Sequence, residues 1–127
     1  MKKCITGLLL LAFAVPSWAE DDVWYCVEEH NYALDNAPDG IYKLVHYKDE
    51  KFTFRYEADK DRLAIVGRTW GASGEPYYLD CTICLSSQGY FGANDNTVKF
   101  RLAESRFFQT QTSNNGAAMT AGTCTKF

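Results

Sequence analysis

The segment "KFTFRYE", residues 51–57, alternates apolar and polar side chains, which is the two-residue period of a half-buried β-strand. Phe52, Phe54 and Tyr56 fall on one face of this expected strand, and polar side chains alternate with them on the other. The segment "TVKFRLA" repeats the pattern. No segment shows the 3.6-residue period of an amphipathic helix. The chain is therefore predicted to be all-β.

Turn residues separate the strand-like segments, and they define about eight expected strands. These cover residues 22–27, 40–47, 51–57, 62–68, 76–86, 96–103, 106–112 and 118–125. Successive short strands of this kind favour a small antiparallel barrel, with a β-sandwich as the alternative. We expect the barrel, because closure removes exposed strand edges. The longest connections are expected at 28–39, 69–75 and 87–95, and binding residues are often found on such loops.

The N-terminus has the layout of a secretory signal peptide. Two lysines precede an apolar run over residues 4–15, and a small residue, Ala19, stands at the expected cleavage point. The apolar run is shorter than the roughly 20 residues that span a bilayer, so no membrane anchor is expected. Removal of residues 1–19 leaves residues 20–127 as a single all-β domain. The expected location is the bacterial periplasm or the medium.

The charge of the mature chain limits the classes of partner. Without the two signal-peptide lysines, 11 basic and 16 acidic side chains remain, a net charge near −5. No basic patch is visible, so nucleic acid is not expected as a partner. We expect a monomer without a cofactor.

The mature chain contains four cysteines, Cys26, Cys81, Cys84 and Cys124. An even number of cysteines in an oxidising compartment predicts two disulfides, with three possible pairings. Cys81 and Cys84 are three residues apart, so a regular strand would direct their sulfur atoms to opposite faces. We therefore expect each of them to bond to Cys26 or Cys124 rather than to each other.

The C-x-x-C spacing also occurs in redox motifs and in zinc sites. A redox pair usually lies at a helix N-terminus, but "LSSQGYFGAND" after Cys84 reads as a loop. The separations from Cys26, Cys124 and the two histidines match no usual zinc-ligand spacing. Structural disulfides are the prediction, and a thiol or metal site at Cys81 and Cys84 is the alternative.

Catalytic motifs are absent from the sequence. His30 and His46 are the two histidines, and no nucleophile elbow, glycine-rich phosphate loop or H-E-x-x-H motif accompanies them. The chain is therefore not expected to be an enzyme.

Aromatic residues in the expected loops are the candidate binding residues. Trp70 lies in "RTWGASGEP", and Tyr90 and Phe91 lie in "SSQGYFGAND". Aromatic side chains on loops of a rigid β-scaffold often contact carbohydrate or protein. The alternative is that these rings fold back and close the ends of the barrel.

Two resemblances extend this interpretation. The end segments "VWYC" and "AGTCTKF" resemble those of small exported bacterial proteins of uncharacterised function. The signal peptide, the early Tyr–Cys pair, the expected barrel and the loop "GASGEPYY" are similar to periplasmic inhibitors of C-type lysozyme. This second resemblance implies that Ser73, as the loop serine, would enter the lysozyme cleft. The function expected is therefore that of a non-enzymatic exported binding protein, with inhibition of a cell-wall hydrolase as the specific hypothesis.

Overall fold

The computed structural model of the chain describes residues 22–36, 39–68, 75–114 and 116–127. These residues form nine β-strands and a single turn of 3-10 helix, Ser86–Gln88. The strands are β1 (Asp22–Asn36), β2 (Tyr42–His46), β3 (Lys51–Glu57), β4 (Arg62–Val66), β5 (Tyr77–Leu85), β6 (Tyr90–Asn94), β7 (Val98–Ala103), β8 (Arg106–Ser113) and β9 (Gly116–Lys126).

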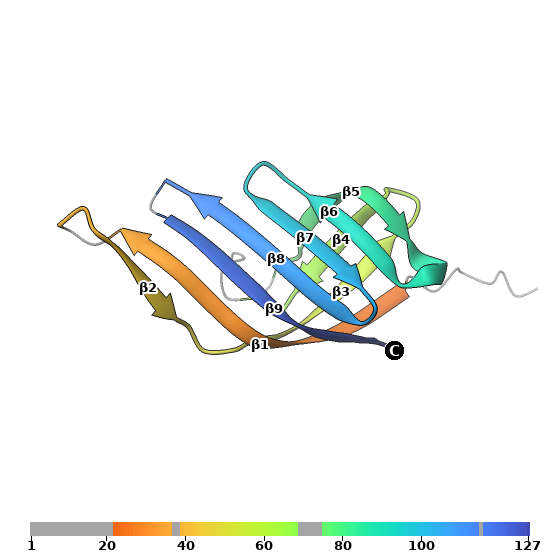
Figure 1. Ribbon diagram of the computed structural model, residues 1–127. Coiled ribbons are helices and arrows are strands. Elements are labelled where there is room, and N and C mark those ends of the chain that lie inside the picture. Colours follow the sequence, from red (N-terminus) through yellow and green to blue (C-terminus); the bar gives the residue numbers. More distant parts are fainter. Residues whose placement is uncertain (1–21, 37–38, 69–74, 115) are drawn as a thin grey trace, which may run out of the picture.

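Eight of these strands close into an antiparallel barrel, as the sequence predicts. The order is β1-β3-β4-β5-β6-β7-β8-β9, and β9 pairs back with β1 to complete the ring. Strand β2 stands outside the ring and pairs with the second half of β1. In Figure 1, β1, β9, β8 and β7 lie side by side in front of β3 and β4.

The core forms from the inward-facing positions of the alternating strands. Phe52 and Phe54 of β3 are buried, as are Val98, Phe100 and Leu102 of β7, which confirms the alternation read from the sequence. Trp24 stacks on Phe54, with their ring centroids 6.1 Å apart. The core cluster as a whole contains Trp24, Cys26, Phe52, Phe54, Leu63, Ile65, Leu79, Phe91, Ala93, Val98, Phe100, Leu102, Phe107 and Cys124.

Two of the expected long loops are instead strands. Residues 28–36, within the loop expected over 28–39, continue β1. Residues 90–94, within the loop expected over 87–95, form β6. Both segments are rich in polar or turn-forming residues, and their pairing with neighbouring strands outweighs this local composition. Residues 69–74 of the third expected loop lie outside the described residues.

One disulfide closes the barrel at its seam. Cys26 of β1 and Cys124 of β9 are directly opposite each other, with Cα atoms 4.1 Å apart, and are bonded. Both residues are completely buried. The bond joins the first and last strands, so it ties the two ends of the described chain together.

The second disulfide joins Cys81 to Cys84, which the sequence analysis predicted would not bond to each other. The prediction was wrong because β5 is not a regular strand. Its register with β6 shifts between Cys81 and Ile83, so that Cys81 lies opposite Ala93 and Cys84 opposite Phe91. An extra residue in one strand reverses the phase of the alternation. Both cysteines therefore lie on the inner side of β5, against the core.

The two disulfides are expected to contribute unequally to stability. The Cys26–Cys124 bond spans 98 residues of sequence, whereas the Cys81–Cys84 bond spans 3. Loop-closure entropy predicts a loss of about 4–5 kcal/mol for the double variant Cys26→Ala/Cys124→Ala, against about 2 kcal/mol for Cys81→Ala/Cys84→Ala. Urea unfolding of both variants measures this difference. Equal losses would show that the entropy of the unfolded chain does not determine the ranking.

Candidate functional site

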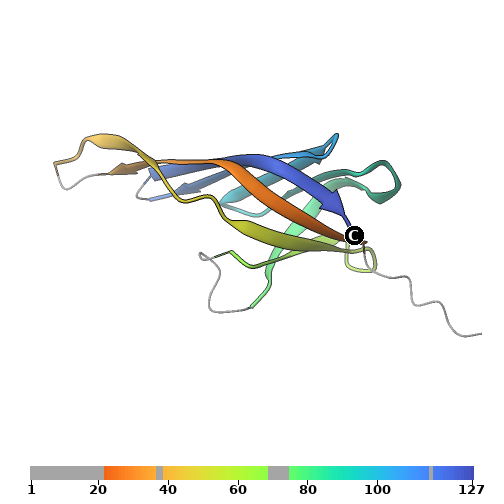
Figure 2. The same cartoon turned by 90° about the horizontal axis from the view of Figure 1, so that it is seen from below.

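Strand β1 continues beyond the barrel and carries an additional piece of sheet. Its first half, Asp22 to Val27, pairs with β3, and its last five residues, Tyr32 to Asn36, pair with β2. Strand β9 follows β1 along most of both halves. Figures 1 and 2 show β2 and the adjoining ends of β1, β8 and β9 projecting from one end of the barrel. We call this part of the sheet the extension.

The outer side of the extension carries apolar side chains that are exposed. Leu34 of β1 lies opposite Leu44 of β2, and Tyr32 of β1 lies opposite Met119 of β9. Leu44 is 68% exposed and Met119 52%. The outer apolar face consists of Leu34, Tyr42, Leu44, Phe108 and Met119, all of which are exposed.

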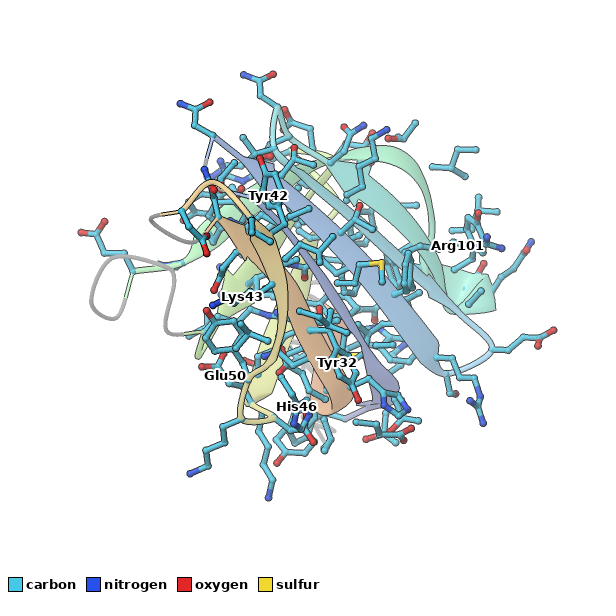
Figure 3. All side chains as sticks on the ribbon, turned by 60° about the vertical axis from the view of Figure 1, so that its left-hand side comes forward. Tyr32, Tyr42, Lys43, His46, Glu50 and Arg101 are labelled. Carbon is cyan, nitrogen blue, oxygen red and sulfur yellow. A yellow bond between two sulfur atoms is a disulfide. The ribbon has the colours of Figure 1, made fainter. Side chains whose placement is uncertain are left out.

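Basic and imidazole groups border the outer apolar face. His46 and His30 lie on either side of Tyr32, with ring centroids 4.8 and 6.4 Å from it. Arg101 of β7 lies opposite Phe108 of β8. Figure 3 shows Tyr32 and His46 at the β1–β2 end of the sheet and Arg101 toward its far side. Although acidic residues outnumber basic ones in the chain, the border of this face carries the guanidinium of Arg101 and two imidazole rings.

The inner side of the extension begins with a buried ion pair. Arg68 Nη1 lies 2.9 Å from Glu28 Oε1, and both side chains are almost completely excluded from solvent. Glu28 Oε2 accepts hydrogen bonds from the Glu50 backbone N–H (2.8 Å) and from Asn31 Nδ2 (3.1 Å). The Arg68 guanidinium also lies over the ring of Phe52, 3.8 Å from its centroid. These contacts hold two opposite charges where the apolar core ends.

Burial changes the proton affinity of both members of the pair. Desolvation raises the pKa of Glu28, and the hydrogen bond from the Glu50 backbone and the charge of Arg68 oppose this shift. Desolvation lowers the pKa of Arg68 to about 10, although the charges of Glu28 and Glu50 act to raise it. Arg68 therefore remains protonated at neutral pH.

Beside this pair the inner side of the extension is hollow. The hollow has a volume of about 360 Å³ and is lined by Asn31, Tyr47, Lys48, Glu50, Gln111, Ala118 and Thr120. We call it the inner hollow. A smaller one of about 200 Å³ adjoins it and shares Tyr47, Gln111 and Ala118. The Tyr47 hydroxyl donates a hydrogen bond to Asp35, which fixes the ring at the boundary between the two.

The binding residues expected from the sequence do not form one site in the described part of the chain. Trp70 and Ser73 lie outside the described residues. Tyr90 is half-buried in β6, and the guanidinium of Arg101 lies 5.8 Å from its ring centroid. Phe91 is completely buried and packs against Trp24 and Phe54, so it belongs to the core and is not available to a partner.

The bonded cysteines lie away from the extension, next to an acidic side chain. The sulfur atoms of Cys81 and Cys84 and a carboxylate oxygen of Asp61 lie within 4.8 Å of one another. The Asp61 carbonyl also accepts a hydrogen bond from the Cys81 N–H (2.9 Å).

The sequence analysis missed Glu28, Arg68, Gln109 and Thr120. One usable signal was present for Gln109, because in "RFFQTQT" it falls two residues after Phe107 and so on the same inward face. Glu28 gave no such signal, because it lay in an expected loop.

Comparisons with known proteins identify no relative: no family model, no curated protein and no solved structure matches the chain. None of the helical structure in the described residues is long and apolar enough to cross a membrane.

The Glu28–Arg68 pair gives a stability prediction with a definite pH dependence. Replacing Arg68 by Met leaves a buried carboxylate without its cation, and we expect a loss of about 3–5 kcal/mol in the free energy of unfolding at pH 7. Adding Glu28→Gln should recover part of this loss, because the buried charge is then removed. Urea unfolding of the single and double variants measures both effects.

The pH dependence follows from the raised pKa of Glu28. As the pH falls, the folded state takes up a proton at Glu28 before the unfolded state does, and this uptake favours folding. Removing Arg68 raises the pKa of Glu28 further, because the Arg68 charge acts to lower it. The variant therefore gains more from this uptake than the wild type does, and its deficit should shrink between pH 7 and the ordinary value of 4.5. A deficit that grows over this range would contradict the assignment of Glu28 as the unpaired charge.

Proposed function

We propose that the chain is a non-enzymatic binding protein of the bacterial envelope and that the outer apolar face of the extension contacts its protein partner. The observation that carries this proposal is the extension itself. Strand β2 takes no part in closing the barrel, yet it displays Tyr42 and Leu44 beside Leu34 and Met119. Contiguous exposed apolar side chains are typical of interaction sites.

The edge of the extension favours a partner with an extended segment. No other strand of the described chain pairs with the outer edge of β2. A free strand edge offers backbone N–H and C=O groups, to which a partner strand can add. Alternate residues of the added strand would then lie beside the outer apolar face. The positive charge of Arg101 and the imidazole N–H groups of the two histidines at the border favour carboxylates in or near that segment.

Both histidines lie at the border of the outer apolar face. His30 and His46 are exposed on the outer side, against Tyr32.

Inhibition of a cell-wall hydrolase is the specific form of this proposal. It rests on the resemblance to periplasmic inhibitors of C-type lysozyme and on the layout of the signal peptide. Export would place the chain in the compartment where such hydrolases act.

The outer apolar face can be tested by site-specific photo-crosslinking in cells. A photoreactive residue at position 44 should give a saturable product with one protein, whereas position 66, exposed on β4, should not. After that protein is purified, Leu44→Asp should weaken binding at least tenfold and Val66→Asp should leave it unchanged. A C-type lysozyme with its cell-wall substrate is the first purified pair to assay, and inhibition should be lost in the Leu44→Asp variant.

Circular dichroism and thermal melting provide the control that both aspartate variants fold. The binding proposal is contradicted if position 44 gives no specific product or if the two variants bind equally. If position 44 captures a protein that is not a hydrolase, the binding role stands and the inhibitor hypothesis is rejected.

The bond between Cys81 and Cys84 suggests a second candidate function, that of an envelope thiol or metal-binding protein. Reduction would place two thiols and the Asp61 carboxylate together, and such a group could hold a metal ion. The same carboxylate opposes a reactive role, because a negative charge beside a thiolate disfavours it. The short 3-10 helix that follows β5 provides no α-helix N-terminus at Cys81 to offset this effect.

We therefore expect the Cys81–Cys84 bond to behave as a structural disulfide. Thiol titration of the denatured, unreduced protein should give no free thiols, and the reduction potential should lie below about −300 mV. A potential above about −230 mV, or zinc bound at one equivalent in the protein as isolated, would support the thiol or metal function. The Asp61→Asn variant should raise the potential, since it removes the charge that opposes the thiolate.

A further inference from the structure

Two buried side-chain oxygens, one of Thr120 in the lining of the inner hollow and one of Gln109 next to Thr120, lack a hydrogen-bond partner in the described part of the chain. Thr120 lies opposite Asn31 of β1 on one side and Gln109 of β8 on the other, so these three side chains form one row across the inner side of the sheet. Thr120 is 7% exposed and lines the hollow, and Gln109 beside it is 2% exposed. Neither Gln109 Oε1 nor Thr120 Oγ1 has a hydrogen-bond partner in the described part of the chain.

Unpaired buried polar atoms carry a free-energy cost. The great majority of buried polar groups in folded proteins are therefore hydrogen-bonded. Replacement of Gln109 and Thr120 by apolar residues of the same shape would remove that cost. Thr120 lines the hollow and Gln109 lies next to it in the sheet, so a molecule that enters the hollow can supply the missing hydrogen bonds.

The missing partner of Gln109 is a donor. Gln109 Oε1 can only accept a hydrogen bond, whereas Thr120 Oγ1 can accept or donate. Because Gln109 and Thr120 are directly opposite each other in the sheet, their Cβ atoms are separated by roughly 5 Å. Two neighbouring hydroxyl groups of one small molecule can therefore reach both oxygens.

The charges of the site favour a ligand without net charge. Glu28 and Arg68 already neutralise each other beside the hollow. Lys48 and Glu50 supply one charge of each sign to its lining. An ion entering this position would be desolvated without a matching counter-charge, whereas hydroxyl groups can bond to the ammonium and to the carboxylate alike.

The volume and the lining of the hollow limit the size and kind of ligand. A volume of about 360 Å³ lies at the small end of the range of about 300–1,000 Å³ that is usual for ligand sites. Ala118 and Ala33, in the next row of the sheet, leave the space open, and the ring of Tyr47 forms one wall. An aromatic wall beside polar groups suits the mixed apolar and hydroxylated faces of a sugar ring.

We propose that the inner hollow binds a neutral polyhydroxylated ligand of the size of one sugar unit. Two of its hydroxyl groups donate to Gln109 Oε1 and Thr120 Oγ1, and its ring lies against Tyr47. The ligand is either a free monosaccharide or the terminal unit of a glycan. This site is on the opposite side of the extension from the outer apolar face, so it is independent of the proposed protein partner.

The test is an NMR titration of the mature, ¹⁵N-labelled protein with glucose, galactose, N-acetylglucosamine and the disaccharide of N-acetylglucosamine. With at least one of these probes, the side-chain amide signals of Gln109 and Gln111 and the backbone signal of Thr120 should shift and saturate. A disaccharide that binds at least tenfold more tightly than its monosaccharide indicates the end of a glycan. Equal affinities indicate a free sugar.

The matched variants are Thr120→Val, inside the hollow, and Thr110→Val, on the outer side of β8. Thr120→Val should weaken sugar binding at least tenfold and leave the melting temperature unchanged or raised, because the hydroxyl has no partner to lose. Thr110→Val and Leu44→Asp should bind sugar like the wild type.

The proposal is overturned if no probe causes saturable shifts at concentrations well above the millimolar range. It is also overturned if Thr120→Val binds sugar normally. A melting temperature lowered by Thr120→Val would show that the hydroxyl serves the fold through an ordered water, which likewise counts against the ligand.

Discussion

The whole structure depends on the pairing of β1 with β9. This pairing closes the barrel, and it continues past the barrel into the extension, so one pair of strands belongs to both parts. The other edge of β1 is divided between β3 and β2. Cys26 and Cys124 fix the pair covalently within the barrel. The extension is therefore a continuation of the barrel wall, formed by the same two strands that close the core.

A bulge in β1 marks the point where the barrel gives way to the extension. The register shifts between Glu28 and His30, and Glu28 lies opposite Gly122 of β9. A Cβ atom at Gly122 would lie only 2.0 Å from the Val27 carbonyl oxygen, so glycine is required for the two strands to approach here. The space beside this close contact holds the Glu28–Arg68 pair. The apolar interior thus ends at a buried charge pair, and the polar lining of the inner hollow begins there.

The sequence was sufficient to predict the parts of the fold in which the alternation is regular. In β3 and β7 every second residue is a large apolar one, and the core follows directly from that pattern. The prediction failed where a bulge shifts the alternation of inward and outward side chains. At Cys81 and Ile83 the shift brings two cysteines to one side, and at Glu28 and His30 it hides a strand within a polar segment. Bulges depend on the partner strand, so the local sequence does not reveal them.

The two proposed sites lie on opposite faces of the same strands. Successive side chains of a strand point to opposite faces, so neighbouring residues belong to different sites. Met119 belongs to the outer apolar face and Thr120 to the inner hollow, although they are adjacent in β9. Leu34 and Ala33 are divided in the same way along β1. A register slip of one residue would exchange the two faces and place Met119 and Leu34 inside. The disulfide at the seam opposes such a slip, since Cys26 and Cys124 are bonded only in the register that keeps the two surfaces apart.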